Sequence, residues 1–562
     1  MDIGLVGSGP AAESIRAACA DIDATVAETA PDSLGSFDLG FVVAAAGSDA
    51  FGAADAAASR WLAVEIGGVG GHAVADLDAA VSAFDPASAD FADLRARVAS
   101  TTESDGRPGG DRAAVRLAGA VAGRRGIALL SGDDVAGTVV EVPGPERSFL
   151  PTPSPTERDR TLDRDFRAVE LDDALTRAES AVDDRVGIVT QVGERESFPL
   201  PYYVAQTADT TVYADARAAE LAGGAAAGWD EAYMKALGEA LERYSAGVYR
   251  TSEFAVAPAA SRPAAVPPSR FVTPDSFRDP DPEEPIQWVE GEDLATGGTV
   301  SLPAEFVHYP PPAERHKPSI TTGLGLGNSG TEAILSGLYE VVERDATMLA
   351  WYSTFDPLGL DVTDETFEAL AARARSESLD VTALLVTQDV DVPVVAVAVH
   401  REGEWPKFAM GSGADLDANR AARSALAEAL QNWTELRAMG PEQAATQGGA
   451  IATYADFPNP ARTFVSPDAT IPADSVGPDE PPEGAAELDA VVSAVADAGL
   501  DAYAARTTPG DVARLGFEAV RVLLPDAQPL FIGEPYFADR AESVPRDLGF
   551  EPRPDREFHP FP

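Results

Sequence analysis

The sequence predicts an α/β protein in two parts, a parallel-sheet domain followed by a larger mixed α+β domain. Within residues 1–125 short apolar runs alternate with alanine-rich helical runs, as strands and helices do in a parallel sheet. The stretch PGPERSFLPTPSPTERDR from Pro143 to Arg160 is proline-rich and polar, which is typical of a linker. Beyond about residue 185, long helical runs and apolar strands mix without a regular repeat, so a repeat solenoid is excluded.

In the first part we expect strands at Ile3–Val6, Leu39–Ala44, Trp61–Ile66, Gly126–Ser131 and Gly137–Val142. A helix through about Cys19 follows the first strand, and another helix follows the second. The turn between the first strand and its helix is Gly7-Ser8-Gly9-Pro10-Ala11-Ala12, which has the form of a dinucleotide-binding turn. Rossmann-like domains that bind no nucleotide carry such turns too, and no clear acidic ribose partner ends the second strand. We interpret it as a structural turn, with nucleotide binding as the alternative.

The elements of the second part are predicted from apolar and helical periodicity. Short strands are expected at Gly187–Gln191, Tyr203–Thr207 and Val394–Val399. Long helices are expected at Asp230–Tyr249, Glu332–Tyr352 and Arg420–Met439, with a proline-dense stretch at Ala257–Arg278 and a smaller αβ section at Leu488–Pro525.

Composition narrows the function classes. The 562 residues include 92 Asp and Glu against 42 Lys and Arg, a formal charge of −50, which opposes binding to nucleic acid and to anionic membranes. The acidic residues are spread along the whole chain, and lysine is rare, with Lys235, Lys317 and Lys407 as its three occurrences. This pattern is typical of a halophilic, haloarchaeal-type protein, with an ordinary acidic protein as the alternative. One cysteine, Cys19, excludes intramolecular disulfides. Without a signal peptide or a long apolar run, we expect a cytoplasmic protein.

A phrase that recurs in the three long helices is the strongest chemical feature. The three copies are Leu237-Gly238-Glu239-Ala240-Leu241-Glu242-Arg243, Leu338-Tyr339-Glu340-Val341-Val342-Glu343-Arg344 and Leu426-Ala427-Glu428-Ala429-Leu430-Gln431-Asn432. In each copy two carboxylate or amide side chains stand at i and i+3 among small or apolar neighbours, so they share a helix face. If these faces converge, their oxygens suit Mg²⁺ with ATP phosphates, and Arg243 or Arg344 suits phosphate. The alternative is an ordinary solvated helix face.

A glycine-rich stretch, Thr322–Gly330, precedes the second copy. Backbone amides in such a loop can cradle phosphates, and Asn328 is a candidate to contact a phosphate or a metal-bound water. The sequence has neither a Walker A lysine motif nor a kinase catalytic loop. A P-loop enzyme and an ordinary protein kinase are therefore excluded.

These motifs resemble the YcaO family over about residues 185–562. The resemblance rests on Lys235–Arg243, on Gly327-Asn328-Ser329-x-x-Glu332-Ala333, on Glu340-x-x-Glu343-Arg344-Asp345 and on Glu428-x-x-Gln431. It implies an ATP- and Mg²⁺-dependent enzyme that phosphorylates a peptide amide oxygen. The product is an azoline, or a thioamide where a partner protein donates sulfur. The implied organisation is an E1-like (ThiF-like) Rossmann-like domain at 1–142, a linker at 143–180 and the YcaO domain at 181–562.

The resemblance also implies roles for individual residues. Carried over, the metal ligands are Glu239, Glu242, Glu340 and Glu343, and the ATP-binding residues are Asn328, Glu332, Arg243, Arg344, Glu428 and Gln431. Two positions depart from the family pattern, because Ala236 and Gly325 stand where serine is frequent. Cyclodehydratases of the family tend to end in Pro-x-Pro-x-Pro, which makes the terminal carboxylate of Pro562 a candidate base. Here the tail, Phe558-His559-Pro560-Phe561-Pro562, carries two of those prolines, and a solvated proline-rich end is the alternative.

The first part resembles the E1-like partner domain that binds the leader of a precursor peptide. That domain commonly carries a four-cysteine zinc site, whereas here Asp90 and Asp93 stand where one cysteine pair is expected. We therefore expect no structural zinc. The expected partners are a peptide or protein substrate, with a leader in some cases, and a second copy in a homodimer. Two other classes remain open: a non-catalytic peptide-binding scaffold for a maturation system, and an oxidoreductase that uses the N-terminal glycine turn.

Overall fold

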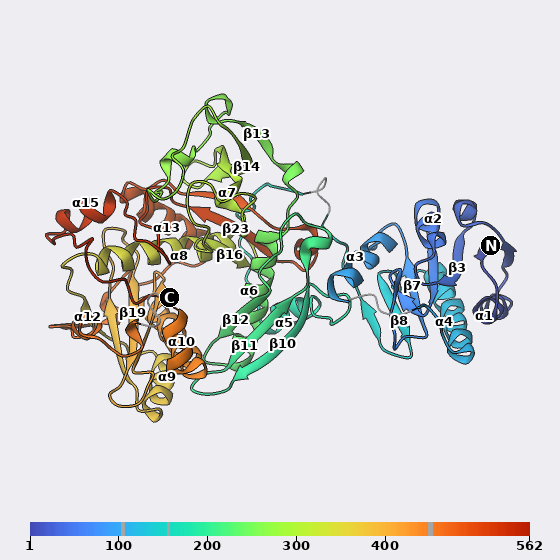
Figure 1. Ribbon diagram of the computed structural model, residues 1–562, viewed down its shortest axis with the longest axis horizontal. Helices are drawn as coiled ribbons and strands as arrows, with labels where there is room; N and C mark the ends of the chain where they lie inside the picture. The colour runs from blue at the N-terminus through green and yellow to red at the C-terminus, as the bar shows by residue number, and fades with distance from the viewer. Residues whose placement is uncertain (103–106, 154–157, 448–452, 562) are drawn as a thin grey trace. The chain divides into compact units, whose positions relative to one another are not determined.

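The computed structural model describes residues 1–102, 107–153, 158–447 and 453–561, which divide into two compact units (Figure 1). Unit 1 comprises Met1–Ser154, Glu179–Gln191 and Gln206–Ala214, and unit 2 comprises Pro155–Ala178, Val192–Ala205 and Asp215–Pro562. Within these described ranges, no helix has the length and apolar character that crossing a membrane requires.

Unit 1 is built on a mixed sheet with the strand order β2-β1-β3-β4-β7-β8-β9. Its strands are β1 (Asp2–Val6), β2 (Thr25–Glu28), β3 (Leu39–Ala45), β4 (Trp61–Ile66), β7 (Ala79–Phe84), β8 (Thr138–Val142) and β9 (Glu146–Ser148). The pairs among β2, β1, β3 and β4 are parallel, whereas β7, β8 and β9 add antiparallel pairs. A parallel return after β4 would need a crossover helix. Residues 67–78 instead hold the short pair β5 (Gly68–Val69) and β6 (His72–Ala73), so the prediction of a wholly parallel sheet is wrong.

The expected strand at Gly126–Ser131 is also wrong, because these residues end a long helix. The helices of unit 1 are α1 (Pro10–Cys19), α2 (Asp49–Ala57), α3 (Phe91–Thr101) and α4 (Arg112–Ser131). Gly119 and Gly123 form a small-residue stripe on α4, where a Cβ added to Gly119 would lie 2.3 Å from the Ala11 oxygen of α1. The glycine and alanine spacing of this segment therefore serves close helix packing rather than a strand.

Asp90 and Asp93, at the positions expected for a cysteine pair, start helix α3. The Asp90 side chain accepts from the Asp93 amide at 2.8 Å, and the Asp93 side chain accepts from the Asp90 amide at 3.0 Å. This reciprocal arrangement is a capping box, which satisfies amides at the helix start. Asp93 also accepts from the amide and hydroxyl of Thr152 at 2.8 and 2.6 Å, so the pair ties α3 to a distant segment by hydrogen bonds.

Unit 2 contains two larger sheets, β13-β14-β22-β23-β16, with β15 paired to β14, and β20-β19-β18-β17-β21. The strands of the first are β13 (Ala255–Pro258), β14 (Pro285–Asp293), β15 (Thr299–Pro303), β16 (Leu324–Gly327), β22 (Tyr503–Arg506) and β23 (Glu518–Leu523). Those of the second are β17 (Leu358–Asp361), β18 (Asp380–Leu385), β19 (Val394–His400), β20 (Phe408–Ala414) and β21 (Thr470–Pro472). A smaller sheet joins β10 (Val189–Glu196), β11 (Tyr202–Thr207) and β12 (Leu221–Ala225).

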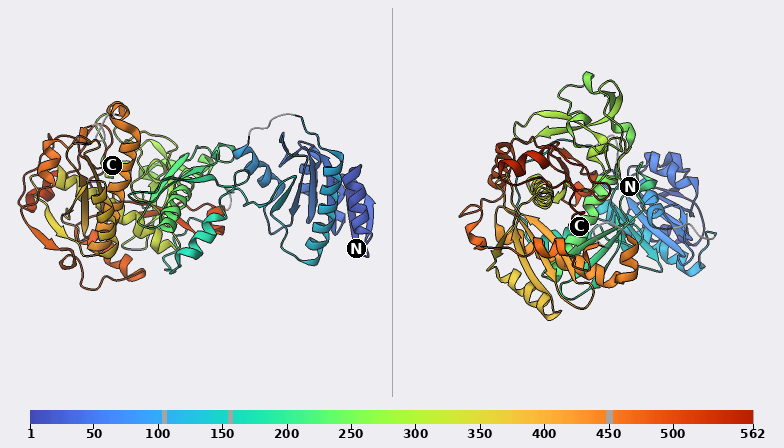
Figure 2. Two further views of the ribbon diagram at one scale, coloured as in Figure 1. Left: turned by 90° about the horizontal axis from the view of Figure 1, so that it is seen from below. Right: turned by 60° about the vertical axis from the view of Figure 1, so that its left-hand side comes forward.

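The three predicted long helices of unit 2 are confirmed as α6, α8 and α10. The helices are α5 (Leu171–Glu179), α6 (Trp229–Gly247), α7 (Ala304–Val307), α8 (Gly330–Trp351), α9 (Glu365–Ser376), α10 (Ala418–Gln447), α12 (Asn459–Phe464), α13 (Ala485–Asp497), α14 (Gly510–Arg514) and α15 (Arg540–Asp547). Helix α10 runs over β20 and β19 (Figure 2). It is kinked at Gly440, before Pro441. It packs closely because Gly411 and Gly413 leave room for its backbone.

The expected linker at 143–180 contains regular structure. Strand β9 pairs with β8, and α5 begins at Leu171. Between them, Arg160 lies 3.3 Å from Glu253, and the Arg158 guanidinium donates to the Val248 oxygen. The prolines limit helix formation here, and the two arginines hold residues 158–160 by contacts within unit 2.

Candidate functional site

The motif helices α6, α8 and α10 meet strand β16 around a cavity of about 710 Å³ in unit 2. Helix α8 lines it with Glu332, Ser336, Glu340 and Arg344, which lie four residues apart and so form one stripe. Helix α6 adds Met234, Lys235, Gly238, Glu239, Glu242 and Arg243, and α10 adds Ser424, Glu428 and Gln431. The volume is in the range of small-molecule sites.

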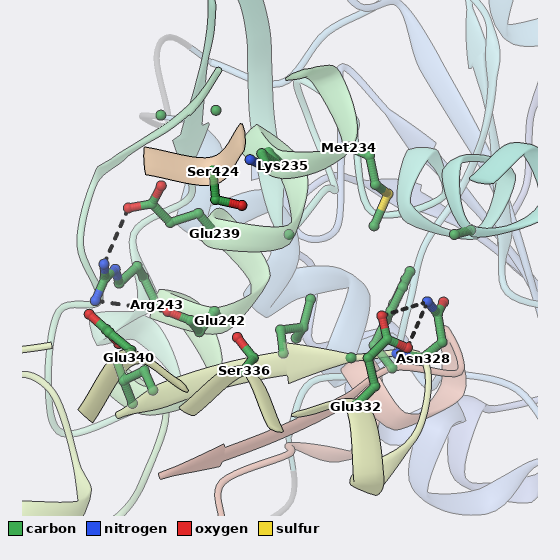
Figure 3. Close-up of a pocket in the computed structure, with 18 of the residues that line it drawn as sticks. Met234, Lys235, Glu239, Glu242, Arg243, Asn328, Glu332, Ser336, Glu340 and Ser424 are labelled. Carbon is green, nitrogen blue, oxygen red and sulfur yellow. Dashed lines mark hydrogen bonds and ion pairs between the residues drawn. The ribbon is translucent and has the colours of Figure 1, made fainter. Parts of the chain in front are cut away.

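One end of this cavity is a cluster of carboxylates around Arg243. Its guanidinium lies 3.2 Å from Glu239 and 3.9 Å from Glu242, and Glu340 reaches the same region from α8 (Figure 3). The Glu340 carboxylate accepts from the Gly323 amide at 2.9 Å. The predicted convergence of the first two motif copies is therefore present.

Arg344 joins the second and third copies. It lies 3.4 Å from Glu343 and 3.5 Å from Glu428. Glu343 itself falls one residue off the α8 stripe, so its carboxylate is turned toward β20, where it accepts from the Ser412 hydroxyl at 2.6 Å. The Ser412 amide donates to Glu428 at 2.6 Å. Glu343 thus lies behind the cavity wall, while Glu340 and Arg344 form the wall.

Burial dominates the electrostatics of this cluster. It raises the pKa of Glu239, the pKa of Glu242 to about 8 and the pKa of Glu343 to about 7, with Arg243 or Arg344 opposing the rise. Burial by itself would lower the pKa of Arg344, but the carboxylates of Glu343, Glu428 and Glu340 raise it. Buried carboxylates whose charge is this costly favour additional positive charge nearby.

At the opposite end, Asn328 and Glu332 mark the start of α8. The Asn328 amide donates to Glu332 at 2.9 Å, and its side-chain oxygen accepts from Arg177 of α5 at 2.5 Å. The glycine-rich stretch was expected to be a loop, but Leu324–Gly327 is strand β16, paired with β23. The amides of Gly323 and Asn328 already donate to Glu340 and Glu332, so in this state those amides hold carboxylates rather than an open phosphate cradle.

A model of the family "YcaO cyclodehydratase, ATP- and Mg²⁺-binding" matches residues 223–528, more than half of the chain. The chain belongs to the YcaO family. The matched range contains all three motif helices, and YcaO proteins are ATP-dependent and bind Mg²⁺.

Individual relatives agree with this membership. An uncharacterised protein in the tfuA 3′ region of Rhizobium leguminosarum bv. trifolii is 28% identical over 165 residues, which are 26% of this chain and 39% of that relative's length. The structure of YcaO from Methanopyrus kandleri bound with AMPPCP and Mg²⁺ has a TM-score of 0.51 at 25% identity, covering 65% of this chain and 92% of that one. A heterocyclase in complex with substrate and cofactor has a TM-score of 0.75 at 18% identity, covering 98% and 83%, which shows a shared fold.

The donor set of the YcaO cavity fits Mg²⁺ with a triphosphate. Its described lining includes five carboxylates, of Glu239, Glu242, Glu332, Glu340 and Glu428, against three basic side chains, of Lys235, Arg243 and Arg344. A triphosphate would be repelled by this excess unless divalent cations accompanied it. Among the described residues, no three His, Cys, Asp or Glu side chains already form a metal cluster. Mg²⁺ usually takes one or two carboxylates and completes its shell with phosphates and water.

Sequence reasoning assigned no role to two basic residues near this site. Lys235 lines the cavity, and burial lowers its pKa. In the sequence it could have been noticed because lysine is rare, with three in the whole chain. Arg521 is 3% exposed, and burial lowers its pKa to about 10. It lines a smaller cavity together with Arg344. In the sequence it stands out as a charge among the apolar residues of β23 (Glu518–Leu523).

Pro562, the predicted catalytic residue, lies outside the described residues. The tail that leads to it is buried: Phe561 is 1% exposed, and the His559 ring nitrogen Nε2 lies 2.7 Å from the Phe531 oxygen. The Tyr454 hydroxyl donates to the Phe558 oxygen. The alternative of a solvated proline-rich end is therefore wrong for residues 559–561.

Proposed function

We propose that this chain uses Mg-ATP to phosphorylate a backbone amide oxygen of a peptide and converts the amide to an azoline. One observation carries the proposal: the buried carboxylate–arginine cluster at the meeting point of α6, α8 and α10. Such a cluster supplies hard oxygen ligands and fixed positive charge in a cavity of ligand size.

The residues divide by the two ends of the cavity. Glu239, Glu242 and Glu340 would hold Mg²⁺ at the charged end, with Glu343 joining them or fixing Arg344. Arg243, Arg344, Glu428 and Gln431 would orient the triphosphate, Asn328 and Glu332 would fix the nucleotide near the start of α8, and Leu171, Leu326 and Phe517 offer apolar walls for the base. When bound, Mg²⁺ neutralises phosphate charge and orients the phosphates for transfer.

The chemistry then proceeds on the peptide. A Cys, Ser or Thr side chain next to the amide loses its proton and adds to the carbonyl carbon. The amide oxygen takes the γ-phosphoryl group, with ADP as the leaving group, and departs as phosphate while the amide nitrogen loses its proton and a C=N bond forms. Arg344 would stabilise the charge on the amide oxygen, and the Pro562 carboxylate is the proposed base. With a sulfur-donor protein the same activation gives a thioamide.

Unit 1 is proposed to be the E1-like domain that binds the leader of a precursor peptide. The match to the heterocyclase fold extends over 98% of the chain, which supports a shared architecture at this end. We keep residues 1–142 as that domain, 143–180 as a connecting segment and 181–562 as the YcaO domain. The same proposal includes a cytoplasmic location and a homodimer. It also includes adaptation to high salt, which rests on the dispersed formal charge of −50.

Intact-mass analysis of candidate Cys- or Ser-containing peptides, incubated with the full chain, Mg²⁺ and ATP, tests the proposal. Loss of the mass of one water identifies an azoline, and exchange of oxygen for sulfur identifies a thioamide. A protein that binds peptide but neither binds nor consumes Mg-ATP would instead be the non-catalytic scaffold, and the proposed activity would be rejected.

A further inference from the structure

A second, mainly apolar cavity lies between α10 and the C-terminal tail. We call it the α10 slot. It has a volume of about 70 Å³, and its apolar walls include Met410 of β20, Leu436 and Met439 of α10, Tyr454, and Phe561 of the tail. None of the residues assigned above to Mg²⁺ or ATP lines the slot in the described part of the chain.

The slot adjoins the ATP cavity along two elements. On α10, Gln431 lines the ATP cavity and Glu435, one turn later, lines the slot. The Gln431 amide donates to the Glu435 carboxylate at 3.2 Å. On β20, Met410 lines the slot, and Ser412, two residues on and on the same face of the strand, contacts Glu343 and Glu428.

These spacings match the repeat of an extended peptide. Four helix residues, from Gln431 to Glu435, advance by about 6 Å, and two strand residues advance by about 6–7 Å. An extended substrate also advances about 6–7 Å over two residues. Arg344 lies 3.4 Å from the Ser412 hydroxyl, so a peptide whose activated amide lies beside Arg344 and which runs along β20 toward Met410 brings the side chain two residues away to the slot.

The walls of the slot are held in place before any peptide arrives. The Tyr454 hydroxyl donates to the Phe558 oxygen, and the Asn432 amide donates to the Met410 oxygen at 2.9 Å. Glu435 at the mouth accepts from the Tyr202 hydroxyl at 2.7 Å. A preformed pocket lowers the entropic cost of binding.

We propose that the α10 slot binds an apolar side chain of the peptide substrate, two residues from the activated amide, and so sets sequence preference. The inference rests on the proposed function and adds a substrate feature to it. Two methionines in the wall suit unbranched or branched aliphatic side chains of leucine or methionine size. The Glu435 carboxylate at the mouth disfavours aspartate and glutamate in the peptide.

The test measures the affinity of the full chain, with Mg-AMPPNP, for the peptides acetyl-X-Gly-Cys-Gly-X-amide, where X is Leu, Ala or Asp. Placing X on both sides of cysteine covers both chain directions. We expect the Leu peptide to bind roughly tenfold more tightly than the Ala peptide, since burying one such side chain is worth about a factor of ten or more. The Asp peptide should bind most weakly.

Leu436→Trp fills the slot and should remove the tenfold preference for Leu over Ala. Leu548→Trp, at an exposed leucine outside both cavities, is the matched control and should keep it. Met439→Ala enlarges the slot and should shift preference from Leu to a Phe peptide, which tests the idea even if Leu436→Trp fails to fold.

Different results would overturn the α10 slot and the proposed function. Wild-type protein that binds Mg-AMPPNP but shows equal affinity for the three peptides, or no binding of the Leu peptide, overturns the slot and leaves the proposed function standing. Protein without Mg²⁺-dependent nucleotide binding overturns the proposed function, and the slot assignment falls with it.

Discussion

Two glycine-rich turns in this chain lead from a strand into a helix, and they differ in what the helix carries. The first joins β1 to α1 through Gly7 and Gly9, and the second joins β16 to α8. Glycine permits a close backbone approach in each segment. A Cβ added to Gly7, in the first turn, would lie 2.2 Å from the Val43 oxygen, and one added to Gly325, in β16 just before the second turn, would lie 2.2 Å from the Ala333 oxygen.

The first turns of the two helices show the difference. In α1, Glu13 is exposed and pairs with exposed Arg116 at 2.7 Å, and Gly9 at the N-cap offers no side-chain cap. In α8, Ser329 caps the helix, and Asn328 holds Glu332 beside the cavity proposed to bind ATP. A glycine turn thus sets the path of the backbone, while the charged stripe on the following helix distinguishes a site from a structural turn.

The largest expected effect comes from removing a carboxylate of the α8 stripe. Glu340→Gln should weaken Mg²⁺-dependent ATP binding by about 100-fold or more, because a proposed metal ligand and its charge are lost together. Calorimetric titration of the full chain with Mg-ATP measures it. Glu13→Gln on α1 is the matched control and should leave the affinity unchanged. Equal affinity of Glu340→Gln and wild type would remove the contrast between the two turns.

A backbone substitution compares the turns as structures. Gly325→Ala should lower the free energy of unfolding by about 3 kcal/mol, because its Cβ meets fixed backbone of α8. Gly9→Ala should cost about 1–2 kcal/mol, from a left-handed φ of 96° with open space around the Cβ. Urea titrations of both variants give the two values. A larger loss in Gly9→Ala would show that strain outweighs crowding at these turns.

The C-terminal end of α8 contacts a buried histidine-containing tail that should make the stability of the fold depend on pH. Its last residue, Trp351, donates to the Glu557 oxygen of the tail at 2.8 Å, and burial lowers the pKa of His559 in that tail from 6.5 to about 4. The unfolded chain takes up this proton below pH 6.5 and the folded chain does not, so stability falls as the pH drops from 6.5 toward 4. The expected loss is about 2 kcal/mol at pH 5 relative to pH 7.

Urea titrations of wild type and His559→Gln at pH 7 and pH 5 isolate this contribution, since the other titrating groups are common to both proteins. The variant should lose about 2 kcal/mol less than wild type on acidification. An identical pH dependence in the two proteins would assign the acid sensitivity to other groups.

The smallest effect concerns the cap of α8. Ser329→Ala removes the oxygen that accepts from the Glu332 amide at 3.4 Å and should cost about 1 kcal/mol of stability. The midpoint of urea unfolding measures it. Ser329→Asp keeps an acceptor at the N-cap and should restore most of the loss; an equal loss in both variants would mean that the cap contributes little.

Much of the fold was predictable because its signals are local. The periodicity of α6, α8 and α10 and the apolar run of β19 were read correctly, as were β3 and β4. Failures arose where tertiary packing decides: the run at Gly126–Ser131 is apolar enough for a strand, and its helical state follows from the fit of Gly119 and Gly123 against α1. Likewise, the antiparallel pairing of β7 depends on a short connection that composition does not reveal.

The sequence predicted which helices form the site, but it predicted less well in which direction their side chains point. An i, i+3 spacing placed Glu340 and Glu343 on one face. In the structure the wall of the cavity follows the i, i+4 row through Glu340 and Arg344, and Glu343 turns to Ser412. Ser412 lies on β20, far along the chain, so no local pattern could have paired it with Glu343. The roles assigned to these residues stay predictions.

The capping box of α3 bears on which metals the protein requires. Asp90 and Asp93 start that helix by binding each other's amides, so side-chain hydrogen bonds of this chain form its N-terminal cap. Removal of metal by a chelator should therefore affect nucleotide binding but not the start of α3, whereas in a protein with a structural zinc it would affect both. EDTA would abolish Mg²⁺-dependent nucleotide binding while α3 keeps its start, so the nucleotide site can be emptied without melting this end of the molecule.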